Sequence, residues 1–553
     1  MLSIKRMFCG VTVVVLSALV FAAGLARGQD AAPAAAKGPP VQIGVVAIKS
    51  FDAAAAFAME IGAPLPPQWS PQGIEQQVPF IGQGNLVTDK PIGIVLFGGA
   101  NFNPQQMMAI MVPVKPGAAS ADAMTKAGGM PVAGHDGMFA RNGVNVTHTG
   151  DYLVVSPEPA LAAMAKPGVL AAALKGPDNL VRIVVDVKAI RTSIPDHINA
   201  FLTHIGEQAA NTPAGQQGAQ LVIPQLKKEL DALDRLEIAL DDGAKGIRLA
   251  FTAAPSKMPA PTAGNRAGMP PGVFARFDLN VSLAKANPEA GRAIVNASVS
   301  ALSNAAKVPF TAERQKRVTD FFSKEVDLAF NPAATSIGIE MIGADPVIYV
   351  VQHWDKSPDC AMELRQVVSE SNAVAEAKDD VIELQTYKSG AMKVMRAVAN
   401  EHGKTIGYLD MVQRDNDVFI AISPTQFRYV DKLIAAPSKG PSRGLASGYL
   451  DLGKLLDAVG QMPNSPLAGM PPDVQKQLKE ILAGQRLTVS ATTEGDAETV
   501  DIGISKGLVQ NAPKLMALIG GMAGGPGGPP GAGPGAGPTD GRAPSPPPGE
   551  VGK

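Results

Sequence analysis

An internal repeat of two kinds of segment constrains the fold of this chain more than any other feature. One kind, called unit A, has a strand that ends in Asp, then helical segments, then a β-hairpin. Copies begin at Val181–Ile190, Val273–Leu283 and Gly448–Leu456, and a weaker copy begins near Ile43. Because strands and helices recur in this fixed order, the chain is predicted to fold as repeated α+β modules.

The other kind of segment, unit B, has a strand, a helix, further strands and a helix after a Ser-Pro step. The two copies contain Ser156-Pro157 and Ser423-Pro424, where the serine is predicted to cap the helix and the proline to occupy its first turn. The Ser-Pro steps are offset by 267 residues, and Asp186 and Asp451 of unit A by 265. Because two separate segments repeat at nearly the same offset, the sequence indicates a duplication in the order A-B-A, A-B-A.

The duplication divides the chain into two tandem α+β halves. Residues 41–260 form half one and residues 273–508 form half two, with a Pro/Gly linker over 261–272. Most strand pairs read as hairpins, so each half is predicted to contain mostly antiparallel sheets covered by amphipathic helices. A short apolar segment, residues 509–519, follows half two.

The two ends of the chain read as segments outside the fold. Residues 1–28 have a positive start, an apolar run and small residues before Gln29, which is typical of a cleaved signal peptide. The alternative is an uncleaved membrane anchor, because the apolar run approaches spanning length. Residues 29–40 read as an Ala/Pro linker and residues 520–553 as a disordered Gly/Pro-rich tail. We therefore expect a periplasmic or extracellular protein with no integral membrane domain after cleavage.

The charge and the cysteine content exclude some classes of protein. Lys and Arg number 49 against 50 Asp and Glu, for a net charge of −1, which excludes a strongly basic nucleic-acid binder. Signal cleavage would remove Cys9 and leave Cys360 as the one cysteine, so an intrachain disulfide is excluded. Stability is expected to come from hydrophobic cores, which a 46% hydrophobic composition can supply.

Three short strings match enzyme motifs but fail in their context. Ser442 lies in a G-x-S-x-G string, yet a helix precedes it and a strand follows, the reverse of a nucleophile elbow. Gly403-Lys404-Thr405 lacks the first glycine of a phosphate-binding loop and reads as part of a hairpin turn. Ser282 and Lys285 have S-x-x-K spacing without the partner motifs. No catalytic residue is assigned, and the protein is predicted not to be an enzyme.

Candidate metal ligands are equally sparse. No histidine pair has the i, i+4 spacing of a helical metal site, and His197 and His204 lie too far apart along one helix for a single ion. Met107, Met108 and Met111 could bind copper, but core packing is the favoured interpretation. No metal and no cofactor is assigned.

Cys360 has the strongest local argument for reactivity. It lies in the first turn of a predicted helix, and His353 ends the preceding strand. The neighbouring Asp359 opposes a thiolate, so a structural thiol is favoured.

The repeated Asp186, Asp278 and Asp451 could converge on one site. Each ends a strand before a helix, so helix capping is the favoured interpretation.

Three functions stay open at this point. The leading hypothesis is an exported, non-enzymatic cell-envelope or extracellular protein that acts as a binding, interaction or structural module for a protein or envelope partner. One alternative is a carrier of an apolar ligand in a groove between helices and sheet. The other is a cell-envelope hydrolase whose site is not recognisable in the sequence.

Overall fold

The computed structural model describes residues 39–523 with gaps. The gaps are 62–69, 78–79, 100–102, 104–105, 119, 142, 175–178, 196–199, 201–202, 204–226, 228–230, 244–245, 256–260, 262–264, 267, 283–294, 297–298, 300–310, 375–380, 438, 442–443, 463–464 and 466. The predicted signal peptide, most of the predicted linker 29–40 and the tail from residue 524 lie outside the described residues.

The described strands form one large sheet of twenty strands and a separate two-stranded sheet. The strands are β1 (Val41–Ile48), β2 (Ile92–Gly98), β3 (Met108–Pro113), β4 (Met130–Pro131), β5 (Met138–Arg141), β6 (Val144–Thr149), β7 (Tyr152–Ser156), β8 (Asn179–Asp186), β9 (Arg235–Gly243), β10 (Gly246–Ala254), β11 (Asn265–Arg266), β12 (Ala275–Leu279), β13 (Ala334–Ile342), β14 (Asp345–His353), β15 (Ile382–Ser389), β16 (Met392–Glu401), β17 (Lys404–Arg414), β18 (Asp417–Ser423), β19 (Lys439–Pro441), β20 (Ala446–Asp451), β21 (Arg486–Glu494) and β22 (Ala497–Ser505).

Thirteen helices are present in the described part of the chain. They are α2 (Phe51–Glu60), α3 (Pro71–Gln77), α4 (Ala121–Lys126), α5 (Pro159–Met164), α6 (Gly168–Ala173), α7 (Val187–Ser193), α12 (Ala312–Phe330), α13 (Cys360–Val374), α14 (Tyr429–Ala435), α15 (Leu452–Gln461), α16 (Pro472–Leu482), α17 (Lys506–Gln510) and α18 (Ala512–Ala523). None of these helices is long and apolar enough to cross a membrane.

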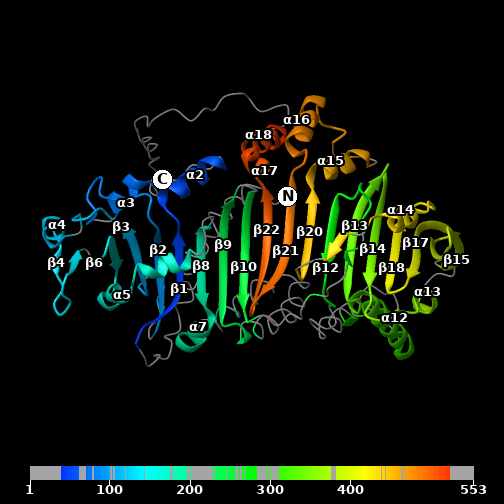
Figure 1. Cartoon of the computed structure of the whole chain (residues 1–553), viewed down its shortest axis with the longest axis horizontal. Coiled ribbons are helices and arrows are strands. Elements are labelled where there is room, and N and C mark those ends of the chain that lie inside the picture. The colour runs from blue at the N-terminus through cyan, green and yellow to red at the C-terminus, as the bar shows by residue number, and fades with distance from the viewer. Residues whose placement is uncertain are drawn as a thin grey trace, which may run out of the picture.

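The large sheet extends across the whole molecule, with its strands side by side from β4 at one end to β15 at the other (Figure 1). Every strand pairing described in it is antiparallel, and the pairings give the spatial order β4-β5-β6-β7-β3-β2-β1-β8-β9-β10-β22-β21-β20-β12-β13-β14-β18-β17-β16-β15. The predicted α+β class with mostly antiparallel strands is therefore confirmed.

The middle of the sheet is the pairing of β10 with β22. Their register extends from Gly246 opposite Ser505 to Ala253 opposite Glu498, with Ala250 opposite Asp501. Each strand would otherwise leave a row of backbone donors and acceptors unpaired at a sheet edge. The sequence predicted separate sheets in two halves, and this non-local pairing joins them into one.

Most helices lie beyond the strand ends or over the outer thirds of the sheet. In Figure 1, α2 and α15 to α18 follow one long border of the sheet, and α7, α12 and α13 follow the other. At the β4 end, buried clusters cover both faces, one with α5 and α6 and one with α2 to α4. At the β15 end, α14 packs on one face and α13 on the other. The middle strands have less helical cover, and this exposes the surface described next.

The Ser-Pro prediction was wrong in its details. Helix α5 begins at Pro159, and Ser156 Oγ donates to Met108 O at 2.7 Å and accepts from Glu158 N at 3.2 Å, before the first helical turn. Helix α14 begins at Tyr429, and Ser423 Oγ donates instead to Thr425 O at 2.7 Å. In both copies the serine fixes the loop between strand and helix rather than the first helical turn.

Candidate functional site

An exposed row of apolar side chains crosses the middle of the sheet on one face. We call this row the apolar stripe; its members are 36–41% exposed and are Phe277, Ile337, Ile348, Ile422, Val489 and Ile502. They lie on six of the seven neighbouring strands from β22 to β18. Monomeric proteins rarely leave such a contiguous apolar surface uncovered unless it has a role in binding.

Strand register makes the apolar stripe continuous. Directly opposite residues in an antiparallel pair point to the same face, and the opposite pairs here are Val489 with Ile502, Phe277 with Ile337, and Ile348 with Ile422. Seven strands spaced about 4.8 Å apart give the apolar stripe a length of about 28 Å. An elongated apolar molecule matches this shape better than a compact one.

The seventh strand, β20, contributes a glycine to the apolar stripe. Gly448 is opposite both Phe277 and Val489. A Cβ atom on Gly448 would lie 3.1 Å from Phe277 Cδ2 and 3.2 Å from Val489 Cγ1, so these two side chains close over the glycine. Continuity across β20 therefore depends on the absence of a side chain there.

The apolar stripe lies between two regions of the same sheet face that are covered by helices. On one side, α2 and α17 pack on Leu240, Ile247 and Ile504. On the other side, α13 packs on Met395 and Met411. Alternation along the strands makes the whole face apolar, and the described helices cover only its ends.

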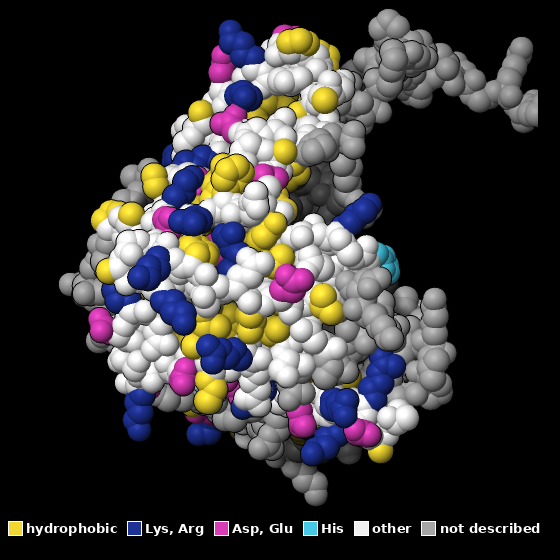
Figure 2. Space-filling view, turned by 90° about the vertical axis from the view of Figure 1, so that its right-hand side faces the viewer, with side chains coloured by type: hydrophobic (Ala, Val, Ile, Leu, Met, Phe, Trp, Pro, Cys, Tyr) yellow, Lys and Arg dark blue, Asp and Glu magenta, His cyan; other side chains and the backbone are white. Residues whose placement is uncertain are grey.

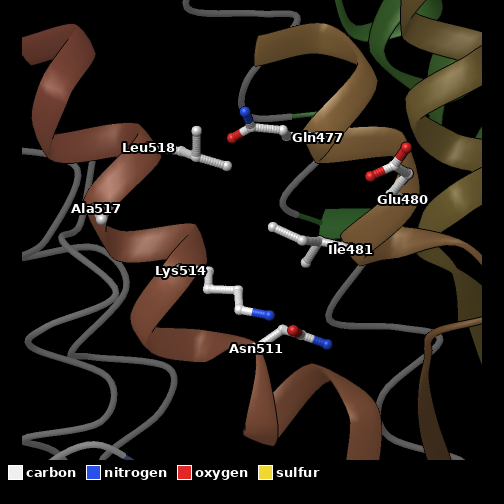
Figure 3. A pocket seen from close by; sticks show the side chains of 7 residues that line it. All are labelled: Gln477, Glu480, Ile481, Asn511, Lys514, Ala517 and Leu518. Atoms are coloured by element: carbon white, nitrogen blue, oxygen red, sulfur yellow. The ribbon is translucent and has the colours of Figure 1, made fainter. Parts of the chain in front are cut away.

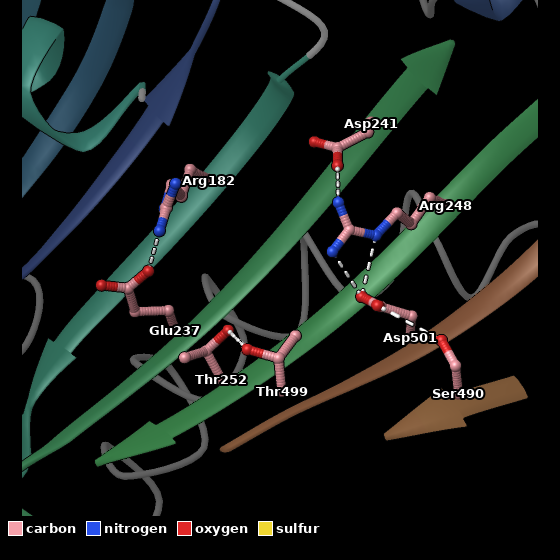
Figure 4. A network of polar contacts seen from close by, with 8 residues as sticks. All are labelled: Arg182, Glu237, Asp241, Arg248, Thr252, Ser490, Thr499 and Asp501. Carbon is pink, nitrogen blue, oxygen red and sulfur yellow. Dashed lines mark hydrogen bonds and ion pairs between the residues drawn. The ribbon is translucent and has the colours of Figure 1, made fainter. Parts of the chain in front are cut away.

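The opposite face of the middle strands is polar. Arg248 bridges the two strands at the centre, with Nη1 3.3 Å from Asp241 Oδ2 and Nη2 2.7 Å from Asp501 Oδ1 (Figure 4). Thr252 and Thr499 share a 2.9 Å hydrogen bond across the same junction. Arg248 on β10 therefore pairs with an acid on each neighbouring strand, and Ser490 Oγ lies 3.5 Å from Asp501 Oδ2 in the same network.

A second polar cluster lies on the polar face at β12 and β13. Asp278 is 3% exposed, and its two carboxylate oxygens share the single N–H of Arg276 Nε, each at 2.9 Å. Its Oδ1 also accepts a 2.6 Å bond from Ser336 Oγ. A buried carboxylate whose oxygens are engaged in this way is a structural group. Asp278 thus pairs with an arginine within a strand.

The other two repeated aspartates act as the sequence predicted. Asp186 Oδ1 accepts from Ala189 N at 2.7 Å and caps α7, and Asp451 Oδ1 accepts from Lys454 N at 3.2 Å and caps α15. The three aspartates lie on β8, β12 and β20 and do not form one site.

A groove of about 580 Å³ lies between α16 and α18 (Figure 3). Its lining combines Glu480, Lys514, Gln477 and Asn511 with the apolar Ile481, Ala517 and Leu518. The lining includes one acid and one amine but no histidine, cysteine or serine. The groove therefore offers weak mixed contacts rather than a reaction centre.

Cys360 is a structural thiol in this structure. Its side chain is buried against α13 and β16 to β18, and burial, with Glu363 and Asp359 adding to it, raises the pKa of the thiol to about 11. His353 Nδ1 is 2.8 Å from Asp417 Oδ1. A protonated buried thiol lacks the thiolate that nucleophilic chemistry requires.

The remaining sequence candidates are dispersed or undescribed. Ser282 is buried, while Lys285, Ser442, His197 and His204 lie outside the described residues. Gly403 is in a hairpin turn between β16 and β17, as predicted.

The methionine cluster belongs to the core, since Met107 and Met111 are buried. Within the described ranges, no three His, Cys, Asp or Glu side chains are grouped to hold a metal ion.

Comparisons with known proteins add little. No family model matches the sequence, and no curated protein matches it. Crystal form I of TP0453 is similar over 45% of this chain and 94% of TP0453, with 11% identity and a TM-score of 0.20. Crystal form III of TP0453 is similar over 46% of this chain and 96% of TP0453, with 10% identity and a TM-score of 0.21. These TM-scores are too low to support an inference about fold or function.

Proposed function

We propose that the protein is an exported, non-enzymatic binding protein of the cell envelope or exterior that binds an elongated apolar ligand. The observation that carries this proposal is the apolar stripe, about 28 Å long by strand spacing, uncharged, 36–41% exposed, and covered by no described helix between α2 and α13. Export rests on residues 1–28, whose sequence is that of a signal peptide.

The ligand class follows from what the apolar stripe contains and lacks. Its six side chains are all branched aliphatic or aromatic, and the face around them has hydrogen-bonding groups only at its margins, such as Thr335 and Gln352. Burial of hydrocarbon against such a surface is favourable by roughly 25 cal/mol per Å². A polar substrate would find no hydrogen-bonding partners on the apolar stripe itself. A long acyl chain is the simplest molecule with this shape and chemistry.

Binding of cis-parinaric acid, a fluorescent long-chain fatty acid, tests the proposal. The double variant Phe277→Ser/Ile337→Ser removes two adjacent side chains, each about 40% exposed. Complete burial of such a side chain is worth about 1.5–3 kcal/mol. Covering only the exposed fraction of both should therefore contribute roughly 1–2.5 kcal/mol, and the variant should bind about 5- to 70-fold more weakly.

Met59→Ser/Met130→Ser is the matched control, because these methionines are among the most exposed apolar side chains and lie outside the apolar stripe. The control should bind as the unaltered protein does. The proposal fails if the unaltered protein does not bind the probe, or if both double variants bind it equally well.

We also propose that the two halves arose by duplication and fusion. Outward from the β10–β22 pair, each strand on one side corresponds in chain order to the strand at the same place on the other, as β8 does to β20 and β1 to β12. The two caps Asp186 and Asp451 hold equivalent places after β8 and β20. An experimental structure in which β1 to β10 fail to superpose on their counterparts would refute the duplication.

A further inference from the structure

The two edges of the large sheet differ in length and composition. At one end, β4 has only two residues, Met130 and Pro131, and a proline cannot donate a hydrogen bond to a further strand. At the other end, β15 has eight residues and no proline, and among the described strands it pairs only with β16 (Figure 1). A very short edge strand and an edge proline are two ways in which proteins block strand addition. One edge of this sheet is therefore blocked, and the other is open.

The side chain of Asn372 on α13 pairs with the first residue of β15 as a neighbouring strand would. Its Oδ1 accepts from Ile382 N at 2.7 Å, and its Nδ2 donates to Ile382 O at 2.9 Å. The backbone groups of Ile382 therefore point away from β16. Because this direction alternates along an antiparallel strand, the backbone groups of Leu384, Thr386 and Lys388 also point outward. No residue in the described part of the chain forms a hydrogen bond with them on that side, so they form an ordered row of donors and acceptors.

Two lysines on one face of this edge determine which kind of strand it favours. Lys388 lies directly opposite Lys393 on β16, and both are exposed. They share the face that α13 covers, since Leu384 on the same face of β15 is opposite Ala397, which is buried against α13. Like charges directly opposite each other destabilise a sheet, and no acid among the described residues forms an ion pair with either lysine.

An added strand with an acidic residue opposite Lys388 would place the carboxylate on the face of both lysines and relieve their repulsion. Figure 2 views the molecule from this end and shows Lys and Arg side chains over much of its surface. The charge of this end therefore favours a partner with an acidic side chain.

A second copy of β15 does not supply that acid. In a two-fold symmetric antiparallel pair of β15 strands, the α13 faces of both copies lie on the same side of the joined sheet. The only acid of β15 is Glu383, which lies one residue from Leu384 and therefore points to the other face. Charge complementarity thus requires a different polypeptide.

We propose that β15 binds an extended segment of another protein by antiparallel strand addition, with an acidic residue of that segment opposite Lys388 and an apolar residue opposite Leu384. Main-chain hydrogen bonds to the open edge supply affinity, and the two side chains supply specificity. Leu384 is 37% exposed, so an apolar side chain in the added strand buries it further. Asn372 holds the start of the edge in place before binding, which reduces the entropy lost on binding.

Fluorescence anisotropy of a labelled synthetic peptide tests the proposal. The peptide Thr-Glu-Thr-Val-Thr-Leu-Lys places glutamate opposite Lys388, valine opposite Thr386 and leucine opposite Leu384. In an antiparallel ladder the N–H of the valine points toward β15, and the N–H of the threonine that follows it points away. N-methylation of the valine should weaken binding about 2- to 13-fold through the lost hydrogen bond alone. N-methylation of that threonine should leave binding unchanged.

Variants of the protein test the same contacts from the other side. Lys388→Glu/Lys393→Glu should bind the peptide roughly 2- to 30-fold more weakly, because a cross-strand pair changes from attractive to repulsive, and it should prefer a peptide with lysine in place of the glutamate. Thr386→Pro should also weaken binding, because it removes an outward N–H that β16 does not use. Lys115→Glu/Lys126→Glu is the matched control, with the same change of charge at exposed positions far from β15, and it should bind as the unaltered protein does.

Three results would overturn the proposal: no binding of the peptide by the unaltered protein, equal binding of the two N-methylated peptides, or a dimer of the unaltered protein that Thr386→Pro converts to a monomer. The last result would mean that a second copy occupies the edge. Circular dichroism of each variant confirms that loss of binding is not loss of folding. Phe277→Ser/Ile337→Ser, which alters the apolar stripe on β12 and β13, should bind the peptide normally, so this test is independent of the proposed ligand site.

Discussion

Removing the charge of Asp410 should strongly destabilise the end of the sheet that holds β15 to β18. Asp410 is 2% exposed and accepts bonds of 2.6 and 2.8 Å from Arg396, which is itself 9% exposed. Asp410→Asn preserves the shape of the side chain but leaves the guanidinium buried without its counter-charge. Breaking a buried pair in this way costs about 3–5 kcal/mol of unfolding free energy.

Cys360 supplies the assay for this prediction. It is buried against Met395, Ala397 and Met411, which lie on the two strands that carry Arg396 and Asp410. In a chain that begins at Gln29 it is the only thiol, so its reaction with a disulfide reagent reports opening of this region alone. When closing is faster than labelling, the labelling rate follows the opening equilibrium. Asp410→Asn should accelerate labelling by a factor of about 10² to 5 × 10³.

Two further variants decide whether the reasoning is correct. Asp417→Asn makes the same chemical change at a pair with His353 that is more than a third exposed, and it should change the rate by less than about fivefold. Arg396→Met/Asp410→Leu removes both charges and should recover most of the stability lost in Asp410→Asn. An acceleration below tenfold for Asp410→Asn would show that solvent or another acid compensates the guanidinium, contrary to the buried geometry.

Three smaller predictions follow from other contacts. Stability should decline from about pH 9 to about pH 11, because burial raises the pKa of Cys360 from 9.0 to about 11 and the unfolded thiol ionises first; Cys360→Ala should reduce this decline in pH-dependent urea unfolding. Gly448→Ala should cost about 1–3 kcal/mol in thermal or urea unfolding, because the new Cβ would lie 2.8 Å from Arg276 O; an unchanged midpoint would contradict the close packing. Asp186→Ala should lower the free energy of unfolding by about 1 kcal/mol through loss of one helix cap. Asp451→Ala should lower it more, because Arg486 Nε also lies 3.3 Å from Asp451 Oδ2. Equal losses of stability would mean that the contact with Arg486 contributes nothing.

Local features of the fold were predictable because the residues that fix them are neighbours in sequence. Asp186 and Asp451 cap helices because a carboxylate at a strand end meets free amides three residues later. The Ser-Pro prediction was wrong because each serine hydroxyl is engaged in the loop before the helix, Ser156 with Met108 O and Glu158 N and Ser423 with Thr425 O. The β10–β22 pairing was not predictable either, because nothing near Gly246 in the sequence specifies Ser505 as its partner.

The apolar stripe was missed for a related reason. Alternating apolar residues on β12 and β21, such as Phe277 and Val489, predict one apolar face for each strand, and that face is normally assigned to the core. Exposure depends on where α2 and α13 end over the sheet, which local sequence does not specify.

The junction at the middle of the sheet also determines the order in which the chain can be completed. Strand β10 precedes the middle of the chain, but its partner β22 is the last described strand of the sheet to emerge during synthesis. Until then β10 is an open edge in a folding intermediate, able to pair with β10 of another chain. A chain built this way is expected to fold slowly, because its central pairing has the greatest sequence separation of the described strand pairings, and its folding should be sensitive to the concentration of its own copies.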